Sequence, residues 1–345
     1  MKNYKVGILG STGYTGSELL RILISHPFAE ITWLTSEKFS GMSIDQVFPQ
    51  FRGFLNIQCT SVSKLNKLPE VDVVFSCLPH GKSMHFVEKF LKIGSKVIDL
   101  SADYRFDGKD IYEKSFGIKH KFEDNLANSV YGLPELYRNQ LAEASLVANP
   151  GCYSTGAILA LAPVLKNGLI RESVVVDSKA GYSGGGRAPS LDHHFSETNE
   201  NISVYAVDGH SQKYEMEQET GKLAGNHVNV AFVPSNVAIS RGILTTIYSE
   251  LQIPLKKPEV LEIYNEFYSG EQFVRICKEG DYPRTKNVRY SNYCDIGVGI
   301  QDKTLIIVSA LDNLGKGASG QAVQNMNVIF DLKESEGLLS LPIYP

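Results

Sequence analysis

A cysteine in the middle of the chain stands where a nucleophile could be activated. It is Cys152, in the octapeptide NPGCYSTG (149–156), and the apolar run AILALAPVL (157–165) follows it. The residues SLVAN (145–149) predict a short strand, and those from Cys152 onward predict a helix. A thiol at a helix start meets the positive end of the helix dipole, which favours the thiolate, and free backbone N–H groups there can stabilise an oxyanion. Gly151 leaves the approach clear. The pattern predicts a cysteine nucleophile.

The alternative interpretation is that Cys152 is a buried structural cysteine. Most free cysteines are small buried hydrophobic residues. The four others each lie in or beside an apolar, strand-like run and fit that description: Cys59, Cys77, Cys277 and Cys294. Five scattered cysteines without a C-x-x-C pair predict neither a disulfide framework nor a zinc site. They fit a reducing, cytoplasmic setting. We therefore expect one reactive thiol, at position 152, and no metal.

A thiol nucleophile needs an acid or base partner, and the chain has eight histidines. His210, in VDGHSQKYEMEQ, follows a glycine and opens a predicted helix in the second half of the chain, which makes it a candidate. A histidine in such a loop can equally be a surface residue. His193 and His194 are adjacent and do not share a face, so no metal pair is expected. His26, beside Pro27 at a helix end, is expected at the surface.

A glycine-rich turn near the N-terminus is the second chemical signal. GSTGYTG (10–16) follows a predicted strand, Tyr4–Leu9, and opens a predicted helix, Thr15–Ser25. Glycines permit a tight turn and a close approach of the backbone to a pyrophosphate, while the helix start supplies N–H groups and a partial positive charge. The spacing is a variant of the commoner G-x-G-x-x-G motif, and such turns can also serve packing alone. After the first strand of a βαβ unit, it predicts a dinucleotide site.

The end of the second predicted strand, TSEK (35–38), should meet the adenosine ribose. Glu37 could accept a hydrogen bond from a ribose 2′-hydroxyl, which favours NAD, whereas Ser36 and Lys38 could hold a 2′-phosphate, which favours NADP. Glu37 and Lys38 can also be solvated surface charges. His80, in LPHG, could line the same cleft. These residues leave the choice between NAD and NADP open.

The elements that would position these residues divide the chain in two. Up to about residue 150, strand and helix patterns alternate, which predicts a Rossmann-type, doubly wound parallel sheet of the α/β class. From about residue 170, longer β-rich runs such as SVVVDSKA and TLIIVSALD predict a mixed or antiparallel sheet. We expect a nucleotide-binding domain over 1–150, a catalytic and dimerisation domain over 151–315, and a helix within 316–345 that packs back onto the first domain.

Composition limits the possible classes of protein. The 345 residues are 43% hydrophobic and 21% charged, as in an ordinary soluble globular protein, and the formal net charge of −4 argues against binding to nucleic acid or to anionic membranes. No stretch approaches the roughly 20 apolar residues of a membrane span. The start MKNYKVGILG runs directly into the glycine-rich turn, so it predicts a core strand rather than a signal peptide.

A nucleotide turn and a nucleophilic cysteine together suggest one type of reaction. The cysteine takes up an acyl group as a thioester, a nicotinamide cofactor delivers a hydride to it, and an aldehyde is released. Neither feature predicts this reaction alone.

Six motifs in the same order carry a resemblance to a known family. They are GSTGYTG, DLSADYR (99–105), YGLPELYR (131–138), NPGCYSTG, AGYSGGGR (180–187) and GKGASGQAVQN (315–325). With these the chain resembles the N-acetyl-gamma-glutamyl-phosphate reductases of arginine biosynthesis, from its first strand to its last helix. That family is related to aspartate-semialdehyde dehydrogenases. The resemblance implies a Rossmann domain with NADP (NADPH), a glyceraldehyde-phosphate-dehydrogenase-like α+β second domain, and a homo-oligomer, dimer or tetramer.

The resemblance also implies roles for individual residues. Cys152 would be the nucleophile and His210 the general acid/base, protonating the hemithioacetal oxygen. Residues near the cofactor would be Gly10, Ser11, Thr12, Gly13, Tyr14, Thr15, Gly16, Ser36, Lys38, Pro79, Asn313 and Lys316. Residues near the substrate, with the two arginines as anion anchors, would be Ser101, Arg105, Tyr131, Glu135, Ser183, Gly184, Arg187 and Gln212. Alternatively, Arg105 forms a surface ion pair with Asp103 or Asp107, and GYSGGGR is a flexible loop.

Two positions depart from the family pattern. Where members commonly carry His-x-His, this chain has His210-Ser211-Gln212, so a role of the second histidine is lost or passes to the Gln212 amide. Glu37 stands where the family frequently has arginine, which weakens the case for NADP unless Lys38 compensates. Rival functions are a related reductase of N-acetyl-aminoadipyl, N-succinyl-glutamyl or aspartyl phosphate, and a non-catalytic NADP sensor.

Overall fold

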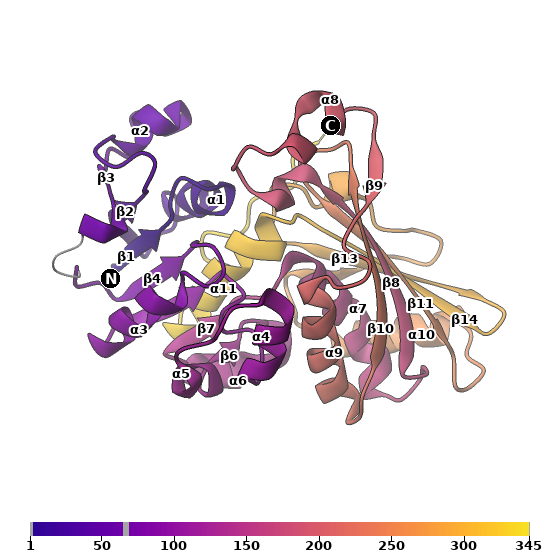
Figure 1. Ribbon diagram of the computed structural model, residues 1–345. Coiled ribbons are helices and arrows are strands. Elements are labelled where there is room, and N and C mark those ends of the chain that lie inside the picture. The colour runs from indigo at the N-terminus through magenta and orange to yellow at the C-terminus, as the bar shows by residue number, and fades with distance from the viewer. Residues whose placement is uncertain (1–2, 65–68, 345) are drawn as a thin grey trace. The chain divides into compact units, whose positions relative to one another are not determined.

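The structure is a computed structural model that describes residues 3–64 and 69–344. The chain forms two compact units, Met1–Pro150 with Ala318–Leu339, and Gly151–Gly317 with Ser340–Pro345. In the described residues each unit is built on one seven-stranded sheet (Figure 1). The α/β class predicted from the alternation of strands and helices is confirmed.

The first unit has a parallel sheet in the order β3-β2-β1-β4-β5-β7-β6. Its strands are short and largely apolar, and β4 is buried along its whole length, as expected where helices cover both faces of a sheet. The strand bounds are β1 Tyr4–Leu9, β2 Ala29–Thr35, β3 Cys59–Thr60, β4 Val73–Ser76, β5 Lys96–Asp99, β6 Val130–Tyr131 and β7 Leu146–Ala148. This is the doubly wound arrangement predicted for the first half of the chain.

Helices of the first unit connect these strands. They are α1 Tyr14–Leu23, α2 Ile44–Val47, α3 Met84–Lys92, α4 Lys109–Phe116, α5 Glu123–Ala127, α6 Pro134–Glu143 and α11 Gly320–Ile329, with 3₁₀ turns η1 Pro49–Phe51 and η2 Val62–Lys64. The last of them, α11, comes from the end of the chain and packs against α1 and α6. Residues 340–345 group with the second unit instead.

His26 is not at the surface, and that expectation was wrong. Its side chain is buried, Nε2 lies 2.9 Å from Oδ1 of Asn327 in α11, and Nδ1 accepts a hydrogen bond from the N–H of Phe28. The contact that buries it comes from a helix some 300 residues away in the chain, which the local sequence around Pro27 does not reveal.

The second unit has a mixed sheet in the order β12-β13-β14-β11-β8-β10-β9. The strands β8 and β10 run parallel, while β11 pairs antiparallel with both β8 and β14. The bounds are β8 Ser173–Gly181, β9 Ile202–Val204, β10 Asn229–Val237, β11 Ile243–Glu250, β12 Val274–Ile276, β13 Cys294–Gln301 and β14 Thr304–Leu311. The predicted β-rich runs correspond to the long strands of this sheet, and the short β9 and β12 were not predicted.

Helices cover one face of that sheet. They are α7 Cys152–Lys166, α9 Ser211–Ala224 and α10 Lys257–Phe267, and the loops carry α8 Phe195–Thr198 and the 3₁₀ turns η3 Tyr182–Gly185, η4 Leu191–His193 and η5 Thr285–Asn287. A turn of π-helix, η6 Gly315–Ser319, precedes α11. Every residue of α7 from Tyr153 to Leu165 is buried, which explains its almost unbroken apolar sequence.

Proline inside α7 is accommodated by one tyrosine of the neighbouring helix α10 and another directly after it. Pro163 has no N–H, so the carbonyl of Leu159 one turn earlier loses its helical partner. The hydroxyl of Tyr268 donates to Leu159 O, and that of Tyr264 donates to Ala160 O. These contacts fix the helix that begins at Cys152 within its own unit.

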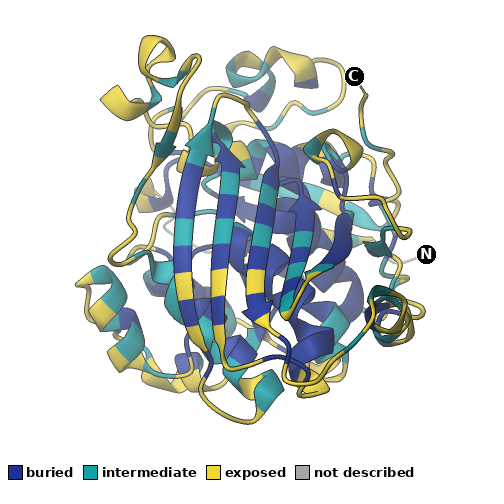
Figure 2. Cartoon of the chain, turned by 90° about the vertical axis from the view of Figure 1, so that its right-hand side faces the viewer, coloured by how far each residue is buried: buried dark blue, intermediate teal, exposed yellow. Residues whose placement is uncertain are grey.

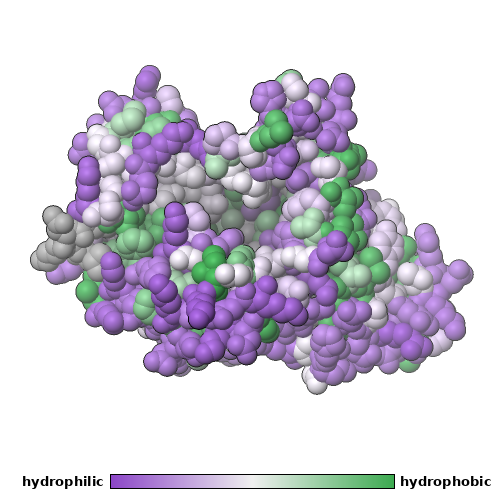
Figure 3. Space-filling view, in the orientation of Figure 1, coloured by the Kyte–Doolittle hydropathy of each residue, from purple (hydrophilic) through white to green (hydrophobic). Residues whose placement is uncertain are grey.

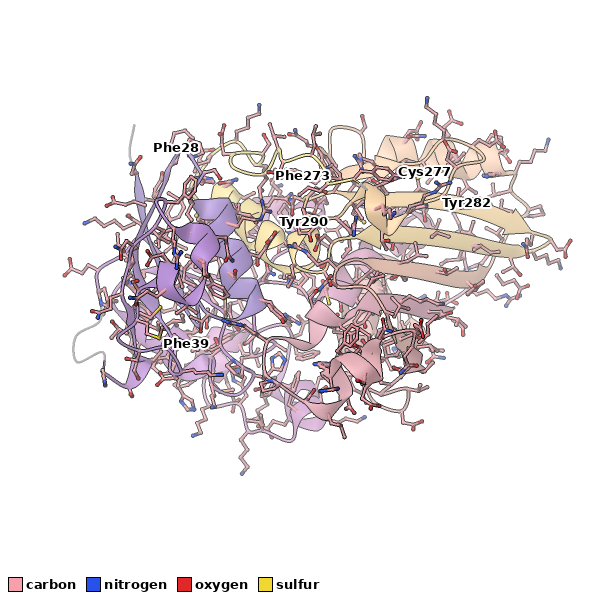
Figure 4. The ribbon with its side chains drawn as sticks, turned by 90° about the horizontal axis from the view of Figure 1, so that it is seen from above. Phe28, Phe39, Phe273, Cys277, Tyr282 and Tyr290 are labelled. Atoms are coloured by element: carbon pink, nitrogen blue, oxygen red, sulfur yellow. The ribbon has the colours of Figure 1, made fainter. Side chains whose placement is uncertain are left out.

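The opposite face of the second sheet is less completely buried (Figure 2). Val175 of β8 and Tyr248 of β11 are neighbours in register there, and both are exposed by about two fifths. Along β13 the same face has glycines at 297 and 299, on which Pro283 and Tyr282 lie; Figure 4 labels Tyr282 beside this sheet. A stripe of hydrophobic surface also follows the edge strand β9 (Figure 3), where Ile202 and Val204 are exposed.

Among residues 3–64 and 69–344, no helix combines the length and the apolar character needed to cross a bilayer.

Candidate active site

A cavity of about 610 Å³ in the second unit brings Cys152 and His210 together. Its walls come from the start of α7, the end of β8 with η3, the segment that carries η4, α8 and β9, and the start of α9. The lining residues are Cys152, Tyr153, Ala180, Gly181, Tyr182, Gly184, Gly185, Asp192, His193, Glu197, Asn201, Ser203, Val204, Tyr205, His210, Gln212, Asn236 and Asn313. The two groups that were predicted to do chemistry thus line one cavity.

The first turn of α9 caps the start of α7. Oε1 of Gln212 accepts hydrogen bonds from the backbone N–H groups of Tyr153 (2.9 Å) and Ser154 (3.0 Å), and Oε1 of Glu215 accepts from the N–H of Gly151 (2.7 Å). We expected N–H groups of this helix start to stabilise an oxyanion, and for these three that expectation was wrong. The first N–H groups of a buried helix need acceptors, and α9 supplies them.

Two glycines permit close approaches around the nucleophile. A Cβ at Gly151 would lie 2.4 Å from Cδ and Oε1 of Gln212, so the missing side chain makes room for Gln212. A Cβ at Gly317 would lie 2.8 Å from Cβ of Cys152. The π-helical turn η6 can therefore pass directly against the nucleophile, and such turns occur often at functional sites.

His210 is the N-cap residue of α9. Its Nδ1 accepts a hydrogen bond of 3.2 Å from the N–H of Gln212. Burial lowers the pKa of His210, and the nearby carboxylate of Glu215 raises it by a smaller amount. The imidazole is therefore mainly neutral at neutral pH, because its pKa falls below the ordinary value of 6.5.

Aromatic side chains surround the imidazole. The rings of Tyr153, Tyr205 and Phe232 meet that of His210 edge-to-face, with centroids 5.6, 5.8 and 5.2 Å away. The hydroxyls of Tyr153 and Tyr205 lie 2.7 Å apart. Burial raises the pKa of Tyr205 to about 12 and that of Tyr153 further. Both phenols therefore stay protonated and can act only as neutral hydrogen-bonding groups.

The other thiols in the described residues do not share this setting. Burial is the largest cause that raises the pKa of Cys59 and Cys77, and it raises the pKa of Cys277 to about 11. Cys294 is fully buried in β13. The prediction that these cysteines are buried holds for Cys59 and Cys294, while Cys77 and Cys277 are partly exposed. A raised pKa keeps a thiol protonated and therefore unreactive.

The loop AGYSGGGR is ordered by contacts to the end of β14. Its η3 turn carries Ser183, whose hydroxyl accepts a hydrogen bond from Nδ2 of Asn313 (2.8 Å), and Oδ1 of Asn313 accepts from the N–H of Gly242. The structure thus places Ser183, Gly184 and Asn313 beside the cavity of Cys152, and the interpretation of this segment as merely a flexible loop is wrong for η3. Arg187 lies beyond η3 and is exposed.

A buried ion pair holds the segment that follows β14. Nε of Arg241 lies 3.0 Å from Oδ2 of Asp312, and the guanidinium stacks 4.3 Å above the ring of Tyr290. Lys316 follows in η6, fully buried, with Nζ 5.9 Å from the ring centroid of Phe273. Figure 4 labels both rings.

In the first unit, the turn 10–16 has the form of a phosphate cradle. Gly10 has φ +75°, and a Cβ there would lie 2.7 Å from the carbonyl oxygen of Cys77. A Cβ at Gly16 would lie 2.7 Å from Gly10 O, whereas Gly13 has only one neighbour, at 3.7 Å. Gly13 is also the N-cap of α1 and has no side chain to cap it. The first N–H groups of α1, including those of Tyr14 and Thr15, are thus arranged to receive an anion.

Hydroxyl groups tie this turn to the end of β2. The N–H and Oγ of Ser11 both donate to the carbonyl of Thr35, at 2.9 and 3.0 Å. Oγ1 of Thr12 lies 2.7 Å from Oγ of Ser36. Lys38 is exposed, with Nζ 5.4 Å from the ring centroid of Phe39, which Figure 4 labels.

Glu37 is engaged by the chain itself. Its Oε2 accepts a hydrogen bond from the hydroxyl of Ser61 (2.6 Å), and its Oε1 accepts from the N–H of Val62 (2.8 Å), at the start of η2. Glu37 is thus an exposed carboxylate that is also tied to the start of η2.

A buried carboxylate pair organises the motif DLSADYR. Asp99 accepts hydrogen bonds from the hydroxyls of Ser83 and Ser101, and Asp103 accepts from the N–H of Gly81 and Met84 and from the hydroxyl of Tyr112. The predicted substrate residue Ser101 thus has its hydroxyl directed to Asp99. Burial first, and then the charge of Asp103, raise the pKa of Asp99 to about 6.

Arg105 is buried rather than at the surface, and its guanidinium contacts backbone carbonyls. Its Nε donates to the carbonyl of Asn149 (2.7 Å) and its Nη2 to that of Leu100 (2.9 Å). Of the remaining predicted residues in this unit, Tyr131 is buried against the ring of Tyr137, Oε1 of Glu135 accepts from Gln324 of α11, and Pro79 is exposed.

Sequence reasoning missed Glu215, which contacts the start of α7, and several residues that line the cavity. Glu215 lies three residues after Gln212 on the same face of α9, so helical spacing could have identified it. Tyr205 and His193 lie in loops without regular spacing, and no signal in the sequence pointed to them. Among the described residues no group of three or more potential metal ligands is found.

Comparisons with known proteins are consistent with this geometry. Residues 5–144 match the family described as semialdehyde dehydrogenase, NAD binding domain, and residues 152–313 match the semialdehyde dehydrogenase, dimerisation domain. Curated proteins named N-acetyl-gamma-glutamyl-phosphate reductase, from Pelotomaculum thermopropionicum and Citrifermentans bemidjiense, are 46% and 47% identical, each over 99% of both chains.

Solved structures show the same fold at lower identity. Aspartate semialdehyde dehydrogenase II from Vibrio cholerae has a TM-score of 0.74 at 18% identity and covers 96% of this chain and 99% of its own. The aspartate semialdehyde dehydrogenase with NADP from Candida albicans has a TM-score of 0.70 at 17% identity, over 95% and 99%.

Proposed function

Because the chain belongs to the family of N-acetyl-gamma-glutamyl-phosphate reductases, we propose that it reduces N-acetyl-gamma-glutamyl phosphate to N-acetylglutamate 5-semialdehyde and phosphate, with NADPH, in arginine biosynthesis. The observation that carries this proposal is the cavity in which Cys152, at the start of α7, lies with His210, at the start of α9. A nucleophile paired with an imidazole suits acyl transfer.

Cys152 acts first. Its thiolate adds to the γ-acyl carbon, the bond to the phosphate oxygen breaks, and a thioester with Cys152 remains. His210, which lines the same cavity, interacts with the acyl oxygen on which negative charge develops. Bound NADPH would supply the hydride that converts this thioester to the aldehyde. Loss of the aldehyde returns the thiolate for the next turnover.

Several predicted residues would bind the two small molecules. The turn 10–16 would hold the cofactor pyrophosphate, since Gly13 and the uncapped start of α1 leave backbone N–H groups for an anion. Pro79, Asn313 and Lys316 would lie near the rest of the cofactor. Residues proposed to bind the substrate are Ser101, Arg105, Tyr131, Glu135, Ser183, Gly184, Arg187 and Gln212. For Gln212 the observed contacts favour a positioning role, because its Oε1 binds backbone N–H groups at the start of α7.

A preference for NADP over NAD is supported by the contacts of Glu37. Both carboxylate oxygens accept hydrogen bonds from residues 61 and 62, which hold this side chain against the start of η2, and Lys38 and Ser36 would bind the 2′-phosphate. Calorimetry with 2′,5′-ADP and 5′-AMP tests this without catalysis. Lys38→Ala should weaken 2′,5′-ADP about ten-fold and leave 5′-AMP unchanged, with Lys92→Ala as the control. Equal loss for both ligands would contradict a role with the 2′-phosphate.

The open face of the second sheet is the proposed contact between two copies of the chain. Half-exposed apolar residues such as Val175 and Tyr248 lie there side by side, in the part that matches a dimerisation domain. Tyr248→Lys should shift the mass in solution, measured by light scattering, toward the monomer. Ile93→Lys, a change at an exposed apolar residue of the first unit, should not. An unchanged mass for Tyr248→Lys would place the contact elsewhere.

The reverse reaction gives the sharpest test of activity. Reduction of NADP by N-acetylglutamate semialdehyde should require inorganic phosphate, and Cys152→Ser should abolish it while Cys277→Ser keeps it. An equal rate of NADP reduction in the absence of phosphate would rule out acyl-phosphate chemistry. A panel of N-acetyl-aminoadipate, N-succinyl-glutamate and aspartate semialdehydes discriminates between related reductases, and cofactor binding without thiol-dependent turnover would indicate an NADP sensor.

A further inference from the structure

We propose that Asn236 of β10 and Ser203 of β9 bind the acetamido group of the substrate and thereby select N-acylated substrates. In this arrangement Nδ2 of Asn236 donates a hydrogen bond to the acetyl carbonyl oxygen, and the hydroxyl of Ser203 accepts one from the amide N–H. The inference deepens the proposed function, on which it rests. Neither residue was predicted from the sequence.

Strand pairing places these two side chains in one row along the wall of the cavity. Asn236 pairs with Ala180 of β8 on one side and with Ser203 on the other. Side chains of residues that lie directly opposite each other in neighbouring strands project to the same face of a sheet. All three residues line the cavity that contains Cys152. Since Ala180 ends in a methyl group, the polar groups of this row are those of Asn236 and Ser203.

The distance of this row from the reacting groups fits the length of the substrate. The ring of Tyr205 meets that of His210 edge-to-face, and the N–H of Tyr205 donates to the carbonyl of Pro234. Ser203 and Asn236 are each two residues from that pair, which is one repeat of the strand or about 7 Å. In an extended substrate, four bonds spanning about 5 Å separate the γ-acyl carbon from the amide nitrogen. A substrate that reacts beside His210 therefore brings its acetamido group to this row.

The charges of the cavity favour an uncharged group at this row. Among the described residues that line the cavity, none is a lysine or an arginine, and the acidic side chains are Asp192 and Glu197. These two repel a carboxylate or a phosphate, and no cation of the lining offsets the repulsion. The acetamido group is neutral and needs one donor and one acceptor. Asn236 and Ser203 supply both, and in the described part of the chain neither side chain has a hydrogen-bond partner.

Partial burial allows these groups to discriminate between substrates. Both side chains are half-buried, and a bound substrate shields them further from water. A substrate with the acetamido group satisfies their hydrogen bonds, whereas one with hydrogen in its place leaves them unpaired and without water. A site built to hydrogen-bond a polar group rejects the analogue that lacks this group more strongly than an apolar pocket does. The N-acetyl group is thus recognised by its polarity as well as by its size.

Specificity constants for two aldehydes test this assignment. N-acetylglutamate semialdehyde carries the acetamido group, and 5-oxopentanoate has the same carbon chain without it. With NADP and phosphate, Asn236→Ala should lower kcat/KM about 10- to 100-fold for the first aldehyde and leave it unchanged for the second. Asn236→Asp, which keeps the shape and loses the donor, and Ser203→Ala should show the same selective loss. Asn229→Ala, at the exposed start of β10, is the control and should change neither constant.

Either of two results overturns the assignment. One is an equal loss of kcat/KM for both aldehydes in Asn236→Ala, which indicates a general disturbance of the cavity. The other is an unchanged kcat/KM for N-acetylglutamate semialdehyde. Failure of the proposed function appears differently, as an absence of phosphate-dependent turnover of N-acetylglutamate semialdehyde by the parent protein.

A binding measurement does not depend on turnover. N-acetylglutamate and glutarate differ in the acetamido group in the same way as the two aldehydes, and calorimetry measures the affinity of each. Asn236→Ala should weaken the binding of N-acetylglutamate about 10- to 100-fold and leave that of glutarate unchanged. If the parent protein binds both acids equally well, or if Asn236→Ala weakens both alike, the row formed by Asn236 and Ser203 does not recognise the acetamido group.

Discussion

Replacement of Gly151 by alanine tests the contact in which Gln212 of α9 caps the start of α7. The new Cβ would lie 2.4 Å from Cδ and Oε1 of Gln212, about 1 Å closer than ordinary van der Waals contact. Gln212 must therefore move by about that distance, and its Oε1 then leaves the N–H groups of Tyr153 and Ser154. We expect a loss of about 1–2 kcal/mol in unfolding free energy, the usual cost of a lost helix cap. A displacement of this size beside the nucleophile should lower kcat about 10²-fold.

A double-mutant cycle identifies the cause. Gln212→Ala removes the same hydrogen bonds and should cost about the same free energy. In the double variant the alanine at 151 meets no glutamine, so its own cost should vanish, and the coupling should be about 1–2 kcal/mol. The assays are urea unfolding followed by circular dichroism and steady-state kinetics. Gly108→Ala, where a Cβ meets no atom within 4 Å, is the control. If the losses in unfolding free energy of the two single variants add up in the double variant, the contact between residues 151 and 212 is not the cause.

Three further predictions follow from the contacts described above. The raised pKa of Asp99 means that the folded protein holds a proton that the unfolded chain releases near pH 3.8. This stabilisation is present below about pH 4 and is lost as the pH rises through about 6, so the unfolding free energy of the parent should fall relative to that of Asp99→Asn between pH 4 and 7. A difference that stays constant across that range would be contrary to it. Iodoacetamide at pH 7.5 should alkylate Cys152 first, as peptide mapping would show, and earlier labelling of Cys277, whose pKa is raised to about 11, would count against the assignment. Tyr205→Phe leaves the buried hydroxyl of Tyr153 without the partner seen 2.7 Å away, so it should cost about 1–3 kcal/mol in unfolding free energy, and an unchanged urea midpoint would argue against this hydrogen bond.

The sequence predicted the parts of the fold that local patterns determine. Apolar runs such as Tyr4–Leu9 and Thr304–Leu311 coincide with β1 and β14. The apolar pattern of a buried strand lies in consecutive residues, so it can be recognised without knowing which strand it pairs with. Short elements such as β9 and β12 were not predicted. Each is only three residues long and pairs with the strand that follows it, β10 or β13, so its own sequence is too short to show a strand pattern.

In the site, too, the sequence predicted what local patterns determine and missed what tertiary contacts determine. A helix beginning at Cys152 and another beginning at His210 follow from local residue patterns, and both are observed. The capping of one by the other is a tertiary contact between residues about 60 positions apart. For that reason the sequence suggested free N–H groups at the start of α7, where the structure has Gln212. Likewise the carboxylate of Glu37, read as a group near the ribose, binds a turn 24 residues away.

The covalent role of Cys152 is tested most directly by mass spectrometry of the acylated protein and of its peptides. The enzyme is mixed with N-acetyl-gamma-glutamyl phosphate without a reduced nicotinamide, quenched in acid and digested. We predict a mass increase of one N-acetylglutamyl group, carried by the peptide that contains Cys152 and absent from Cys152→Ser. A parent protein that consumes the acyl phosphate and yet carries no acyl group at residue 152 would contradict the mechanism.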